Sequence, residues 1–99
     1  MADPYILQSL MRQALRWTIA AEQDENLLIR LTHANYGVAY ITALRQIASN
    51  GEVKQATGYD PHQVGEYIAR VQDWALRSFA PHVPQMIPKG PLGQMIKER

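Results

Sequence analysis

The residues of this 99-residue chain that could do acid–base chemistry or bind a metal are three histidines and two adjacent carboxylates. His33, His62 and His82 lie far apart, and none has a second histidine three or four residues away, the spacing that places two ligands on one helix face. No acidic residue lies at ligand spacing from His33 along its expected helix. Asp24 and Glu25 stand where a helix should begin, and carboxylates there stabilise its positive end. We therefore expect no metal, no cofactor and no enzymatic activity.

Residues 53–68, VKQATGYDPHQVGEYI, resemble the helix-turn-helix of bacterial repressors, with Gly58 in the position of the turn glycine. The resemblance implies that the second helix enters the major groove of DNA. However, Lys54 stands where that family has a small residue. Residues 51–67 also carry one lysine against three acidic residues, and the chain has no basic stripe to neutralise phosphates. The nucleic-acid alternative would use His62, Gln63, Glu66 and Arg70. The other interpretation is a helical corner, ended by Gly58 and restarted by an Asp-Pro cap.

A second pattern, HANYGVAYITALRQIAS…ATGYD…YIARVQD within residues 33–73, is similar to small all-helical proteins encoded by large DNA viruses. The resemblance implies a minor capsid or virion component, located in the cytoplasm or the virion. The N-terminus lacks the cationic start and apolar core of a signal peptide, and no apolar run approaches ~18 residues. We expect neither secretion by a signal peptide nor a membrane span.

Capping signals predict an all-α fold. Asp3-Pro4 and Asp60-Pro61 each place a good N-cap before a proline in the first helical position. Between these two helices we expect a long central helix over residues 24–49, ended by Asn50-Gly51. Four of the six prolines follow residue 80, which excludes a regular element there. The prediction is a three-helix bundle over residues 1–80 and an extended proline-rich C-terminal arm over residues 81–99.

Several apolar residues are left without a partner in such a bundle. The central helix has apolar stripes on two sides, one of which includes Tyr36 and Tyr40, so we expect it to be buried on both sides. Gly37 weakens this helix by roughly 1 kcal/mol relative to alanine, which predicts close packing of a neighbouring helix. Leu15 and Ile19 fall outside the inner face of the first helix, which includes Leu10 and Trp17.

The C-terminal arm is also unusually apolar, since polar residues dominate ordinary linkers. We interpret the protein as a non-enzymatic structural or interaction subunit of a larger assembly, which binds protein partners or self-associates. The residues expected to contact partners are Leu15, Ile19, Tyr36, Tyr40, Met86, Ile87, Leu92, Met95 and Ile96.

Overall fold

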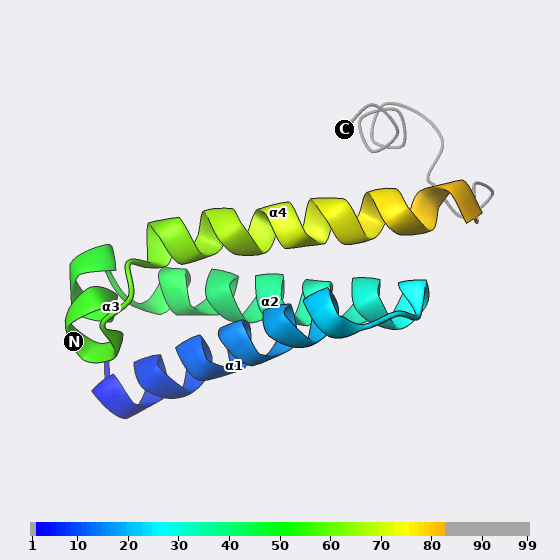
Figure 1. The fold of residues 1–99 in the computed structure, drawn as a ribbon. Helices are drawn as coiled ribbons and strands as arrows, with labels where there is room; N and C mark the ends of the chain where they lie inside the picture. The colour runs from blue at the N-terminus through cyan, green and yellow to red at the C-terminus, as the bar shows by residue number, and fades with distance from the viewer. Residues whose placement is uncertain (1, 83–99) are drawn as a thin grey trace.

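The structure, a computed structural model, describes residues 2–82 as an all-α fold, as the sequence predicts. Its elements are α1 (Pro4–Gln23), α2 (Leu27–Ile47), α3 (Asn50–Thr57), α4 (Pro61–Phe79) and a short 3-10 helix, η1 (Ala80–His82). Figure 1 shows α1 and α4 running along α2 in the opposite direction to it, with α3 at one end. The expectation that no regular element follows residue 80 is wrong for residues 81 and 82, which belong to η1. The rest of the expected C-terminal arm, from residue 83 onward, lies outside the described residues.

The expected start of the central helix is wrong. Asp24 ends α1 instead of beginning the next helix: its backbone is extended and its N–H donates to the carbonyl of Ala20 at 3.0 Å. Asn26 is the N-cap of α2, and its side-chain oxygen accepts from two backbone N–H groups of the first turn at 3.0 and 3.1 Å. The central helix therefore begins three residues later than expected, at Leu27.

The expected end of the central helix, and with it the count of three helices, is also wrong. α2 ends at Ile47, and Ala48 adopts an extended conformation with φ −150° and ψ 153°. Ser49 then starts α3 through a capping box, in which its hydroxyl accepts from the N–H of Glu52 while its own N–H donates to the Glu52 carboxylate. The hydrogen bonds from Ser49 lower the pKa of Glu52. The capping box of Ser49 and Glu52 thus begins a helix at Asn50-Gly51, the pair that we expected to end one.

The molecule is thin because its three long helices lie nearly in one layer. Its principal dimensions are 44 × 29 × 16 Å. α2 lies between α1 and α4, which contact each other much less than they contact α2. The buried core residues are Leu7, Met11, Ala14, Ala21, Ala34, Ile41, Leu44, Val53, Ile68, Val71 and Ala75. Broad surfaces of α1 and α2 stay outside this core.

Gly37 of α2 is the point of closest approach to α1, which confirms the close packing that the sequence predicts. A Cβ atom added there would lie 3.3 Å from the carbonyl oxygen of Ala14 and still closer to the hydroxyl of Thr18. That buried hydroxyl donates to the same Ala14 carbonyl at 2.7 Å. The packing fixes the middle of α1 beside the middle of α2.

Candidate interaction surface

The exposed side of α2 carries no formal charge. Its two permanently charged residues both lie toward α4: the guanidinium of Arg30 stacks on Trp74 at 4.1 Å, and that of Arg45 lies beside Gly65. Every other exposed residue of α2 is uncharged: Leu28, Ile29, Asn35, Tyr36, Ala39, Thr42, Gln46 and Ile47. A helix face of this kind on a small protein is unusual because solvated surface normally carries charged residues.

Within this side, six residues alternate at spacings of four and three, the pattern of the a and d positions in a coiled coil. They are Ile29, His33, Tyr36, Tyr40, Ala43 and Ile47. Ile29, Tyr36 and Ile47 are 45%, 46% and 51% exposed, and the other three are partly buried. The stripe has the sequence of a packing seam. Tyr40 packs against the core and Trp17 of α1 contacts His33 and Tyr36, but Ile29, Tyr36 and Ile47 remain about half exposed.

A matching stripe of α1 lies beside the one on α2. The ring of Trp17 meets Tyr36 edge-on, with 5.3 Å between the centroids, and lies 4.9 Å from the ring of His33. The residues that share the Trp17 side of α1 recur at the same spacing of four and three, and none is charged. They are Ile6, Leu10, Gln13, Trp17 and Ala20. We call the two stripes together the α1–α2 face.

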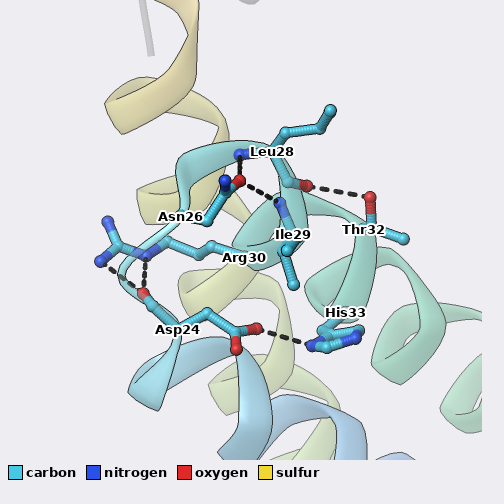
Figure 2. A network of polar contacts seen from close by, with 7 residues as sticks. All are labelled: Asp24, Asn26, Leu28, Ile29, Arg30, Thr32 and His33. Atoms are coloured by element: carbon cyan, nitrogen blue, oxygen red, sulfur yellow. Dashed lines mark hydrogen bonds and ion pairs between the residues drawn. The ribbon is translucent and has the colours of Figure 1, made fainter.

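A polar network closes the end of the α1–α2 face at the turn between the two helices (Figure 2). The guanidinium of Arg30 donates twice to the backbone carbonyl of Asp24, at 3.1 and 2.8 Å. The carboxylate of Asp24 forms a 2.6 Å hydrogen bond with Nδ1 of His33, and both side chains are about a quarter exposed. This pairing orients the imidazole against Trp17. Within residues 2–82, no three histidine or acidic side chains converge as a metal site.

Sequence reasoning missed the Asp24–His33 pair because it searched for an acidic partner along the histidine's own helix. The two residues are nine positions apart, and the α1–α2 turn brings them together. It also assigned Leu10 and Trp17 to the inner face of α1. Leu10 does pack against the core, but both residues are only partly buried and belong to the α1–α2 face. Spacing could not have revealed this, because the stripe residues at 6, 10, 13, 17 and 20 recur at the same spacing as the buried residues of α1 and each lies one position before a buried residue.

The partner-contacting residues predicted from the sequence fall into two described groups. Tyr36 and Tyr40 belong to the α1–α2 face. Leu15 and Ile19 lie elsewhere on α1, where they line a groove of about 530 Å³ with Arg12 and with Tyr59 from beyond α3. The structure does not bring these two pairs together. The remaining five, Met86, Ile87, Leu92, Met95 and Ile96, lie outside the described residues.

The residues of the nucleic-acid alternative lie together on the exposed side of α4. Gly58, with φ 81°, joins α3 to α4 and gives the helix–turn–helix outline. His62, Gln63, Glu66 and Arg70 are all exposed. However, Nε2 of His62 lies 3.1 Å from the Glu66 carboxylate, and the guanidinium of Arg70 lies 5.8 Å from the centre of the Tyr67 ring. The Glu66 carboxylate therefore lies on the surface that would have to meet phosphate, and it would repel that group.

Among the described helices, none combines the length and apolarity needed to cross a bilayer. Comparison of the chain with models of protein families, with curated proteins and with solved structures gave no match.

Proposed function

We propose that this protein is a non-enzymatic structural or interaction subunit of a larger assembly, and that its α1–α2 face binds a neighbouring protein chain. The observation that carries the proposal is a two-helix surface whose stripe residues have coiled-coil spacing, partly exposed apolar side chains and no formal charge. Two charged groups contact it: the Arg16 guanidinium lies 5.1 Å from the centre of the Trp17 ring, and the Asp24 carboxylate pairs with His33. Depletion of charged residues is the compositional signature of interface cores, whereas bulk hydrophobicity is not. Contiguous apolar patches likewise mark interaction sites more reliably than scattered apolar residues.

Two further regions would contact neighbours in such an assembly. One is the groove lined by Leu15 and Ile19, whose apolar floor is flanked by Arg12 and Arg16. The other is the C-terminal segment, for which the support is its sequence of apolar residues spaced among prolines. A minor capsid or virion component is one assembly of this kind, and its support is the resemblance of the pattern within residues 33–73 to viral proteins.

The proposal is tested by light scattering of the full chain over a concentration series up to roughly 100 μM, well above the dissociation constants of typical specific complexes. We expect a mass above that of the monomer. Tyr36→Lys places a charge in the middle of the face and should return the chain to a monomer. Ala69→Lys adds the same charge at an exposed position of α4 and should leave the mass unchanged. A wild-type chain that stays monomeric throughout the series would overturn the proposal.

The alternative is a helix-turn-helix nucleic-acid-binding protein, which the outline of α3, Gly58 and α4 favours. Its test is a salt titration of binding to random duplex DNA. A reader of DNA binds at low salt with an affinity that falls steeply as salt rises, because binding releases counterions from the phosphates. The acidic residues near the turn lead us to expect no binding even at low salt.

A further inference from the structure

Four of the six stripe residues of α2 keep the same order when the stripe is followed in either direction. Ile29 and Ile47 lie nine positions on either side of residue 38, and Tyr36 and Tyr40 lie two positions on either side of it. His33 and Ala43, a large and a small residue, lie five positions on either side. A helix with this order is complementary to an antiparallel copy of itself, since every residue then meets its counterpart.

The stripe of α1 has a similar order about Gln13. Ile6 and Ala20 lie seven positions on either side of it, and Leu10 and Trp17 lie three and four positions away. Large residues again stand opposite smaller ones. At the centre, the amide of Gln13 would meet the same amide of an antiparallel copy, and an amide group can both donate and accept hydrogen bonds.

The two centres lie close to the same level of the molecule. Gly37, next to the centre of α2, packs against Thr18 and the carbonyl of Ala14. Because α1 and α2 are antiparallel, the contact between the rings of Trp17 and Tyr36 places Gln13 level with residue 40, about 3 Å along the helix from residue 38. One two-fold axis, perpendicular to both helices, can relate both stripes to their copies with a shift of this size. An isologous interface requires this property, because the same patch must serve both subunits.

We propose, resting on the interaction role proposed above, that the partner of the α1–α2 face is a second copy of this chain. The two copies form an antiparallel four-helix bundle from α1 and α2 of each, with the two-fold axis passing near Gln13 and residue 38. Ile29 then meets Ile47 of the partner subunit, and Tyr36 meets Tyr40 of the partner subunit. Neither stripe contains an aspartate, glutamate, lysine or arginine, so the dimer does not bring stripe residues of like charge together.

The size of the face suits a dimer of moderate affinity. A helix of 21 residues is about 31 Å long and about 10 Å wide, so two helices side by side give a footprint of about 600 Å². Specific complexes bury about 800 Å² per partner, so the footprint falls toward the lower end of their range. We expect dissociation in the micromolar range. A different protein would not require the symmetric order of residues, which is why a second copy is the occupant we infer.

The test uses engineered cysteines, because the chain contains none of its own. Gln13→Cys lies at the axis and should form a disulfide-linked dimer with itself under mild oxidation. Ile29→Cys and Ile47→Cys should cross-link when the two variants are mixed, and neither should cross-link alone. In the antiparallel dimer, the two copies of residue 29 lie about 27 Å apart along the helix, far beyond the reach of a disulfide. Ala69→Cys, at an exposed position of α4 outside both proposed contact regions, is the control that should not cross-link.

Circular dichroism of each variant establishes that it keeps the helical signal of the wild type. Cross-linking of Ile29→Cys with itself would show a parallel arrangement and overturn the inference. If the wild type self-associates by light scattering but Gln13→Cys and the mixed pair do not cross-link, this geometry is wrong while the proposed interaction role stands. A wild-type chain that remains monomeric overturns both.

Discussion

Replacement of Gly37 by alanine tests the packing that places α1 beside α2. Glycine to alanine in the interior of a helix is ordinarily stabilising by roughly 1 kcal/mol. At Gly37 the new Cβ would fall inside van der Waals contact of the Thr18 hydroxyl and 3.3 Å from the Ala14 carbonyl oxygen. One atom of the new methyl group would thus strain the buried hydrogen bond between these two residues.

The magnitude follows from two costs set against the gain. Overpacking of a tight helix contact costs about 1–3 kcal/mol. Loss of the hydrogen bond of the buried Thr18 hydroxyl costs about 1–3 kcal/mol more if the side chain rotates away. After the gain in helix propensity, we expect Gly37→Ala to reduce the free energy of unfolding by about 2 kcal/mol. For a domain of this size the corresponding fall in Tm is about 8–16 °C.

The assay is thermal unfolding followed by circular dichroism at one fixed protein concentration, since association would shift the apparent stability. Gly51→Ala is the matched control: it is also helical, nothing lies within 4 Å of the added Cβ, and it should raise Tm slightly. Thr18→Ala should cost less in the Gly37→Ala background than in the wild type, because it removes the atom nearest the new methyl. If Gly37→Ala raises Tm as Gly51→Ala does, the close approach of α1 and α2 is refuted.

Three further outcomes follow from the structure. Arg30→Lys should lower the urea midpoint by the equivalent of about 1 kcal/mol, because lysine lacks the planar guanidinium that donates twice to the Asp24 carbonyl. An unchanged midpoint would show that these two hydrogen bonds do not stabilise the turn between α1 and α2. The hydrogen bond from Tyr67 to the Glu22 carboxylate, 2.6 Å long, raises the pKa of Tyr67 above its ordinary 10.0. The stability it contributes is present below that pH and lost as pH rises through the raised pKa, so urea unfolding of the wild type and of Tyr67→Phe should converge in alkali; a constant difference would contradict this. Deletion of residues 83–99 should leave the dimer through the α1–α2 face intact by light scattering and remove any larger assembly, whereas unchanged assembly would exclude a contact through this segment.

The local signals of the chain predicted its helix starts well where one signal acted alone. Asp3 and Asp60 cap α1 and α4 as expected, each with a proline in the first turn. The prediction failed where two signals competed within three residues. Asn50-Gly51 is a good helix stop, yet Ser49 and Glu52 form a capping box that starts α3 at the same place. Which signal prevails depends on the burial of Val53 in the core, a tertiary contribution that local propensity does not contain.

The candidate surface was predicted in part. Tyr36 and Tyr40 were identified because they belong to a series of apolar residues that recurs at helical spacing along one helix, and such a series is visible within one segment of the sequence. The contributions of Trp17 and of the Asp24–His33 pair were not identified, because each joins residues from different elements.

The sequence by itself determined that the protein is helical and that α1 and α2 each carry an uncharged stripe, because caps and helical periodicity are properties of short segments. Only the tertiary structure decided that the two stripes lie side by side with their centres within about 3 Å of one level. The reason is the packing of Gly37 on Ala14 and Thr18, which sets the rotation and the vertical register of the two helices together.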